Sequence, residues 1–208
     1  MDALIFDVDG TLWDSTEKVA VAWRQVCERE GVPSDMITPE RLKKEFGKTL
    51  ENIGYSLFPF LPKEEAVRVT ALACDLENES LLADPPALYP GVKKAFETLS
   101  QSLPLFIVSN CQAGYIEVLL ETTGLTPYVK DHLCPGDTGE AKAANIRSIV
   151  GKYHLKSAVY IGDTMGDYLA TKEAGLPFLF ASYGFGNVPE PDGIIEKPED
   201  LLLVPGLI

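Results

Sequence analysis

Four short apolar runs, each followed by a polar turn and a helical stretch, constrain the fold of this chain most. The runs lie at 3–6, 103–108, 158–161 and 176–180. Short apolar strands that alternate with helices are typical of a parallel sheet covered on both faces. The sequence therefore predicts an α/β fold with a doubly wound parallel sheet, a Rossmann-like core.

The interval between the first two runs, from about 14 to about 89, is far too long for one crossover helix. A helix over 15–30 ends at Gly31, Thr38 and Pro39 begin a second, and Pro62 opens a third that reaches about 82. The sequence predicts a small α-helical cap domain at 15–86, inserted into a core formed by 1–14 and 87–208. We expect the two linkers to act as a hinge.

The remaining pattern completes the core. Helices are expected at about 91–100, 113–123, 141–153 and 165–174, the last ended by Gly175. A short edge strand at 193–195 is expected to precede a final helix.

Composition limits the partners. A chain of 208 residues with 46% hydrophobic content can bury a proper core, and its net charge of −13 disfavours nucleic acid and anionic membranes. Four scattered cysteines favour reduced thiols, and we find neither a basic leader nor an apolar run of membrane-spanning length. We expect a cytoplasmic protein that contacts neither nucleic acid nor membrane and is a monomer or a weak homodimer.

Two carboxylates follow the first apolar run directly. Asp7 and Asp9 are two residues apart, so they can point the same way where the strand ends. Two like charges there need a counterion or a shared proton, which a divalent metal or general acid chemistry supplies. This pair suggests metal-dependent covalent chemistry.

Other polar residues also follow predicted strands, and ligands of such sheets bind at the carboxyl ends of the strands. Each of these residues alone is usually a turn, a cap or a solvated side chain, but their ordered arrival at successive strand ends favours a site. The set suits a metal and a phosphoryl group. Its members are Asp7, Asp9, Thr11, Ser109, Asn110, Lys142, Asp163 and Asp167.

These residues resemble the motifs of the haloacid dehalogenase superfamily of phosphatases. The resemblance covers nearly the whole chain, and the helical insertion after the first motif is similar to the cap of the phosphoglycolate phosphatase-like subgroup. The four matching motifs are 7–11, Ser109 with Asn110, Lys142, and 162–167.

The resemblance implies distinct roles for the carboxylates. Asp7 would attack phosphorus and form an aspartyl phosphate, whereas Asp9 would protonate the leaving group and then activate water. Mg2+ would bind Asp7, the backbone carbonyl of Asp9 and Asp163, and Asp167 would complete the metal group by supporting these ligands.

Further residues would hold the phosphate. Lys142 and Ser109 would neutralise its oxygens, with Asn110 and Thr11 beside them. Ala143 stands where many relatives have a proline, which is a departure from the third motif.

The cap would contact the substrate beyond the phosphate. The candidate specificity residues are Lys43, Lys44 and Lys48, which lie around Gly47 and could meet a carboxylate or a second phosphate. The alternative is a solvated helix end. The loop 183–186 is expected to border the site.

The function implied by the resemblance is a magnesium-dependent phosphomonoesterase acting on a small-molecule phosphate ester. A sugar phosphomutase of the same superfamily would use the same two aspartates and stays an alternative. A non-catalytic binding protein with this fold is a further alternative. A dehalogenase is disfavoured, because Asp9 would then have no leaving group to protonate.

Overall fold

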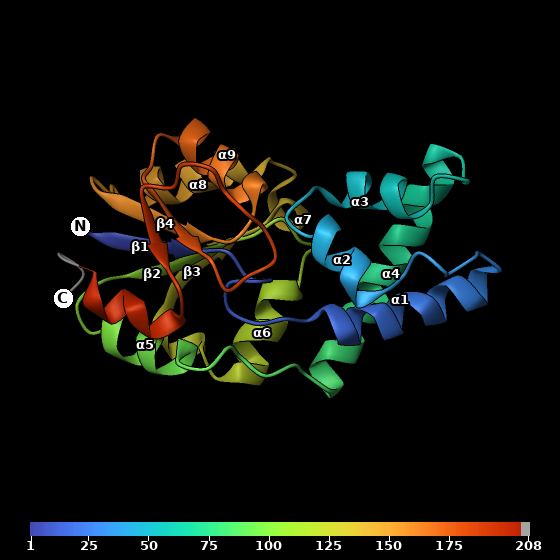
Figure 1. Cartoon of the computed structure of the whole chain (residues 1–208), viewed down its shortest axis with the longest axis horizontal. Helices are drawn as coiled ribbons and strands as arrows, with labels where there is room; N and C mark the ends of the chain where they lie inside the picture. The colour runs from blue at the N-terminus through green and yellow to red at the C-terminus, as the bar shows by residue number, and fades with distance from the viewer. Residues whose placement is uncertain (205–208) are drawn as a thin grey trace.

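The structure, a computed structural model, describes residues 1–204 and is built around a six-stranded parallel sheet (Figure 1). Its spatial order is β3-β2-β1-β4-β5-β6, with every neighbouring pair parallel. The predicted doubly wound α/β fold is confirmed. The strands are β1 (Ala3–Phe6), β2 (Leu105–Val108), β3 (Val129–Leu133), β4 (Ala158–Gly162), β5 (Phe178–Ala181) and β6 (Gly193–Ile195).

Most strands lie where the sequence predicts them, but β3 was missed. Its sequence, VKDHL, is only partly buried and contains two charged residues and a histidine, because β3 is an edge strand. An edge strand has one neighbour and less apolar packing, so the pattern that marks the central strands is absent from it. The predicted edge strand at 193–195 is confirmed as β6.

The helices form two groups (Figure 1). One group covers the faces of the sheet, with α8 and α9 on one side and α5 and α6 on the other, and the other group, α1–α4, forms a helical lobe beside the sheet. The helices are α1 (Thr16–Glu30), α2 (Pro39–Glu45), α3 (Leu50–Leu57), α4 (Lys63–Ala83), α5 (Val92–Leu99), α6 (Tyr115–Thr123), α7 (Pro135–Thr138), α8 (Lys142–Lys152) and α9 (Met165–Ala174).

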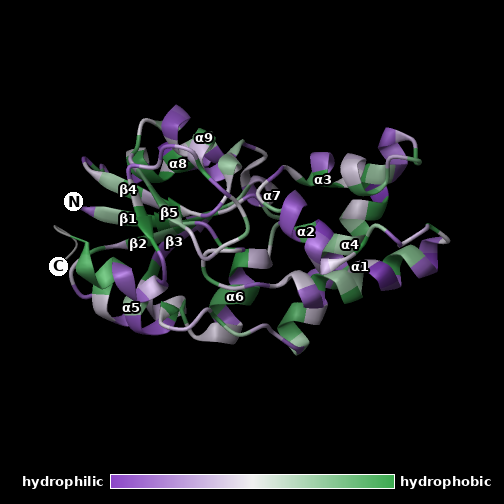
Figure 2. Cartoon of the chain, viewed as in Figure 1, coloured by the Kyte–Doolittle hydropathy of each residue, from purple (hydrophilic) through white to green (hydrophobic). Residues whose placement is uncertain are grey.

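Two apolar clusters hold the sheet between its helices, and Figure 2 shows the central strands as largely hydrophobic. Alternate residues of β1 enter opposite clusters, Leu4 and Phe6 on one face and Ala3 and Ile5 on the other. This is the two-residue period of a strand that is buried on both faces. The first cluster continues through Trp13 into the helical lobe, so one apolar core joins lobe and sheet.

The helical lobe has four helices where the sequence predicted three. Thr38 caps α2 through a hydrogen bond from the Arg41 amide, with Pro39 in the first turn, as expected. The additional helix, α3, begins after Thr49, whose side chain accepts a hydrogen bond from the Asn52 amide. It is only eight residues long, and no helix was predicted there from the sequence. The predicted final helix is a 3-10 helix, Pro198–Leu203, and a second one lies at Thr126–Tyr128.

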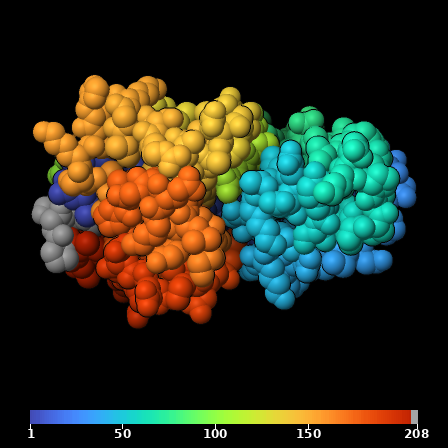
Figure 3. All heavy atoms as spheres, turned by 90° about the horizontal axis from the view of Figure 1, so that it is seen from above, coloured from blue at the N-terminus to red at the C-terminus, as the bar shows by residue number. Residues whose placement is uncertain are grey.

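The lobe and the sheet domain touch directly. In Figure 3 the cyan surface of the lobe lies against the yellow and orange surface of the C-terminal half. The division into a core (1–14 and 87–208) and a cap (15–86) stays a prediction, and residues 205–208 of that core lie outside the described part.

Two sequence features relate to the surroundings of the protein. Among residues 1–204, none of the helices combines the length and the apolar character needed to cross a lipid bilayer. The four cysteines are buried and free of disulfide bonds, as their scattered spacing predicts.

We expect Phe106→Ala to lower the free energy of unfolding by about 3–5 kcal/mol, because it removes a fully buried ring from the centre of the sheet. The Phe106 ring lies 4.8 Å from that of Tyr153, between centroids. Urea unfolding followed by circular dichroism measures the loss. The control, Val21→Ala, changes a residue that is 49% exposed, and an equal loss in both variants would contradict this account of the core.

Candidate active site

The topology brings the carboxyl ends of β1 and β4 together. These two strands are neighbours, and the chain runs from β1 to one side of the sheet and from β4 to the other. Such a switch point leaves an open crevice between the connections. Asp7 follows β1 and Asp163 follows β4, so the fold itself juxtaposes them.

Lys142 joins these carboxylates from the start of α8. Its ammonium Nζ lies 2.7 Å from Asp7 Oδ1 and 2.5 Å from Asp167 Oδ1, and all three side chains are buried. Burial opposes the charge on the lysine, but Asp167 and Asp7 together raise the pKa of Lys142 well above its usual value. Lys142 is therefore a fixed positive charge.

Asp7 lies in opposing fields. Burial and the nearby Asp167 carboxylate raise the pKa of Asp7 to about 6, while Lys142 and a hydrogen bond with the Ser109 side chain lower it. The direct ion pair with Lys142 favours the ionised form. An ionised, hydrogen-bonded carboxylate at the end of a strand can act as a nucleophile or a metal ligand.

Three buried carboxylates form a potential metal centre. Oxygen atoms of Asp7, Asp163 and Asp167 lie within 4.8 Å of one another. Asp163 accepts hydrogen bonds from the Phe185 amide at 2.7 Å and from Thr11 at 3.4 Å. Burial, and then the like charges of Asp167 and Asp7, raise the pKa of Asp163 well above its usual value, and a bound cation would relieve the repulsion between the like charges. Hard oxygen donors of this kind fit a divalent ion such as Mg2+.

Asp167 is held by the first turn of α9. Its Oδ2 accepts hydrogen bonds from the amide and hydroxyl of Thr164 at 2.9 and 2.7 Å, and the Thr164 hydroxyl in turn accepts from the Asp167 amide. This reciprocal pattern is a capping box. Both carboxylate oxygens of Asp167 are thus engaged, one by Lys142 and one by Thr164, so its geometry suits support of the site.

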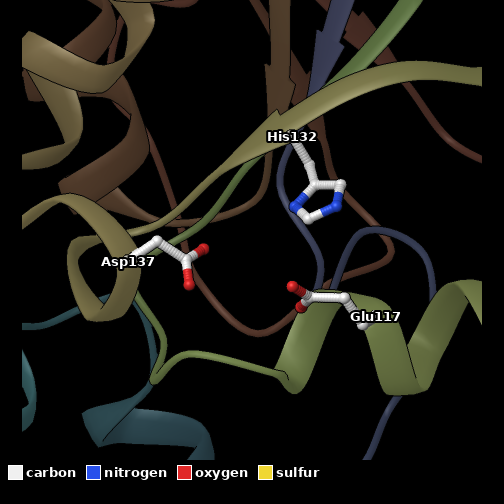
Figure 4. A group of neighbouring side chains, drawn as sticks. All are labelled: Glu117, His132 and Asp137. Carbon is white, nitrogen blue, oxygen red and sulfur yellow. The ribbon is translucent and has the colours of Figure 1, made fainter.

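A second group of potential ligands, Glu117, His132 and Asp137, lies apart from this centre (Figure 4). Glu117 and Asp137 are exposed, and solvent competes with any ion there. The three buried carboxylates are therefore the better candidate metal centre.

Asp9 lies in a different environment from Asp7. Its carboxyl group accepts hydrogen bonds from Ser15 Oγ at 2.5 Å and from the Tyr115 hydroxyl at 2.9 Å. Burial raises the pKa of Asp9 to about 8, against the opposing effect of these two hydroxyls. A carboxyl group with only neutral hydrogen-bond partners can carry a proton near neutral pH.

Gly10 allows the turn between these two environments. Its φ is +79°, and a Cβ placed there would lie 2.0 Å from Asp163 Oδ2. A side chain at this position is excluded by both the backbone conformation and the approach of Asp163. Gly10 therefore brings the chain after Asp9 against the metal centre.

A cavity opens between these strand ends and the helical lobe. Polar groups line its inner end, and a mostly apolar wall supplied by the lobe lines its outer end. The inner residues, from the core, are Asp7, Asp9, Ser109, Asn110, Cys111, Gln112 and Tyr115, and the outer ones, from the lobe, are Trp23, Phe46, Gly47, Leu50, Ile53 and Glu77.

The structure does not bring every predicted site residue to this cavity. Lys43 pairs with Asp14 at 2.7 Å, Lys48 pairs with Glu45 at 2.6 Å, and Lys44 is exposed. None of these three lysines is among the residues that line the cavity.

Two other predicted residues contact neighbouring protein groups. Thr11 lies 3.4 Å from Asp163, and Asn110 donates its amide to the Gly47 carbonyl at 2.8 Å. Asn110 thus ties the end of β2 to the lobe. The loop after β5 borders the site as expected, since its Phe185 amide binds Asp163.

Three residues of the site were not predicted from the sequence. Ser15 and Tyr115 hold Asp9 from separate elements, and no spacing in the sequence links them to it. Glu77, in contrast, could have been found from the sequence. It falls on the buried face of α4, at helical spacing from Ala73 and Leu81, and a charge on an apolar face is unusual.

Comparisons with known proteins agree with this geometry. The family model of haloacid dehalogenase-like hydrolases matches residues 4–181. Phosphoglycolate phosphatases of Vibrio parahaemolyticus and Aquifex aeolicus are 28% and 29% identical, over 97% of this chain and 94% and 95% of theirs. A haloacid dehalogenase-like hydrolase from Streptococcus pneumoniae superposes with a TM-score of 0.85 at 24% identity, over 98% of this chain and 97% of that one.

The chain belongs to the haloacid dehalogenase-like hydrolase family. The family predicted from the motifs at 7–11 and 162–167 is thereby confirmed, and with it the prediction of a hydrolase.

We expect Lys142→Met to lower the free energy of unfolding by about 3–5 kcal/mol when no divalent cation is added, because Asp7 and Asp167 lose their buried countercharge. The matched control is Lys152→Met, which removes an exposed ion pair with Asp131 at the other end of α8. Denaturant unfolding in the presence of a chelator measures both. Equal stability of the two variants would show that Lys142 does not hold the carboxylates together.

Proposed function

We propose that this protein is a magnesium-dependent phosphomonoesterase that hydrolyses a small phosphate ester through an aspartyl phosphate on Asp7. The observation that carries the proposal is the pairing of two unlike carboxyl groups at one cavity. Asp7 is ion-paired to Lys142, whereas Asp9 has only hydroxyl partners. One is suited to attack and the other to donate a proton.

In the first step, an Asp7 oxygen forms a bond to phosphorus while the bond from phosphorus to the ester oxygen breaks. Asp9 donates its proton to the departing oxygen, which leaves as an alcohol. Ser15 and Tyr115 fix the Asp9 carboxyl group for this transfer through their hydrogen bonds.

In the second step, water attacks the phosphorus of the aspartyl phosphate. Asp9, now ionised, takes a proton from that water, and the bond between phosphorus and Asp7 breaks. Inorganic phosphate leaves, and Asp7 and Asp9 regain their starting protonation states. The two steps thus consume one water for each ester.

The metal and the phosphate would share the inner end of the cavity. Asp7, Asp163 and the Asp9 backbone carbonyl would hold Mg2+, and Asp167 would support them through Lys142 and Thr164. A bound Mg2+ would neutralise the phosphate and orient it for in-line attack. Lys142 and Ser109 lie beside Asp7 and would face the phosphate oxygens.

The helical lobe would act as the cap of this site. We propose that 15–86 is a cap domain, since its residues Phe46, Leu50 and Glu77 cover the outer end of the cavity. A covered site excludes bulk water from the reaction. The linkers near 14 and 86 would be its hinge.

We expect Asp7→Asn to abolish the magnesium-dependent release of p-nitrophenol from p-nitrophenyl phosphate, because an amide cannot form the acyl phosphate. Initial rates with Mg2+, and with a chelator followed by added Mg2+, measure the activity. The control, Asp75→Asn, changes an exposed carboxylate on α4 and should keep the rate. Unchanged turnover in the Asp7→Asn protein would overturn the mechanism.

We expect Asp9→Asn to slow ester cleavage according to the leaving group. An alkoxide needs a proton, so the first step with an alkyl phosphate should fall by about 10²-fold or more. Nitrophenolate leaves unprotonated, so the pre-steady-state burst of p-nitrophenol should fall by much less. Rapid quench of both reactions measures the difference. Equal losses for the two esters would show that Asp9 does not protonate the leaving group.

A further inference from the structure

Glu77 is a buried carboxylate that the proposed mechanism does not use. It lies on α4, is 5% exposed, and lines the outer end of the cavity that contains Asp7 and Asp9. The other residues of that outer wall are aromatic or aliphatic, apart from Gly47. Glu77 is thus the one charged group that the lobe places on the cavity among the described residues.

Two neutral donors orient the Glu77 carboxylate. The indole Nε1 of Trp23 donates to Oε2 at 2.5 Å, and the side-chain amide of Gln112 donates to Oε1 at 3.0 Å. A carboxylate offers about four acceptor positions, so two stay available to another donor. Burial raises the pKa of Glu77 to about 7, and these two hydrogen bonds oppose the rise.

Positive charge is absent from this end of the cavity. Among the described residues that line it there is no lysine, arginine or histidine. Lys142 does not line the cavity and is engaged by two carboxylates behind it, and the lysines near Gly47 pair elsewhere or are exposed. A second anionic group on a bound ester would therefore meet Glu77 without a counterion.

A hydroxyl group on the bound ester would instead be compatible with Glu77. It would donate a hydrogen bond to a free acceptor position of Glu77, while the aromatic and aliphatic wall covers the carbon atoms of the leaving group. Removing that hydroxyl would leave a buried acceptor unpaired, which is an effective basis for selection.

We propose that Glu77 is a specificity-determining residue and that the substrate is the phosphate ester of a small hydroxylated, otherwise neutral alcohol. This inference rests on the proposed phosphomonoesterase function. It separates this chain from an enzyme for phosphoglycolate, whose leaving group carries a carboxylate. The relatives of Vibrio parahaemolyticus and Aquifex aeolicus that are named for that substrate are 28% and 29% identical to this chain, which leaves room for such a difference.

Two esters of nearly equal size test the inference. In 2-hydroxyethyl phosphate a CH2OH group stands where phosphoglycolate has a carboxylate. With Mg2+ present and at a pH well above the Glu77 pKa of about 7, where Glu77 is ionised, we expect kcat/KM to be at least about tenfold higher for 2-hydroxyethyl phosphate. In Glu77→Gln this ratio should fall by about tenfold or more, because the amide removes the charge and can donate to a carboxylate. Glu79→Gln, an exposed change on the same helix, should keep the ratio.

The ratio of kcat/KM for the two esters separates substrate selection from folding, because a loss of folded enzyme lowers the rates for both esters equally. Glu77→Asp, which keeps the charge, should keep the preference for the hydroxylated ester. A wild-type preference for phosphoglycolate, or an unchanged ratio in Glu77→Gln, would overturn the role of Glu77 while p-nitrophenyl phosphate is still hydrolysed. Failure of the wild-type protein to hydrolyse any ester, including p-nitrophenyl phosphate, would overturn the proposed function and this inference with it.

Discussion

The buried ammonium group of Lys142 is the interaction on which the site depends. It lies between Asp7 and Asp167 in a place that solvent does not reach. With Asp163 included, three buried carboxyl groups share one lysine, and in their ionised forms they would carry an excess of two negative charges. Desolvation makes such an excess costly, and a divalent cation bound there would neutralise it. The contact of Lys142 with Asp7 also orients the Asp7 carboxylate, so the same lysine balances the charge and positions this side chain.

In the proposed mechanism, the different roles of Asp7 and Asp9 follow from the elements that contact each of them. Only Val8 separates them in the chain, but Asp7 contacts the start of α8, and Asp9 contacts hydroxyls from the lobe linker and α6. Burial alone would raise both pKa values. The single cation beside Asp7 favours its ionised form, and its absence beside Asp9 favours a proton there. The local turn at Gly10 makes this separation possible.

The sequence predicted what repeats along the chain and missed what depends on contacts between distant segments. Central strands are buried on both faces, so they leave apolar runs that can be predicted from the sequence. The polar residues that follow these runs lie at the carboxyl ends of the strands, which is why Asp7 and Asp163 could be predicted to lie together. The edge strand Val129–Leu133 lacks that burial and left no pattern. Tyr115 could not be linked to Asp9, because 106 positions separate them and only the folded chain brings them together. The expected catalytic roles of Asp7 and Asp9 came from the resemblance to the family motifs, because hydrophobic periodicity alone does not predict a reaction.

Contact between lobe and core completes the cavity, and this bears on how a leaving group would be recognised. Gln112 follows β2 in the core, yet its amide donates to both Glu77 and Asn78 of α4. Asn110, two residues earlier, binds the carbonyl of Gly47 in the lobe. Gln112 therefore both joins the lobe to the core and orients the Glu77 carboxylate. A lobe that moved away would take Glu77 from Gln112 and Gly47 from Asn110, and it would leave the contacts of Lys142 with Asp7 and Asp167 in place. In the proposed function, residues at the strand ends would hold the phosphate, whereas discrimination among alcohols would require the lobe in contact with the core.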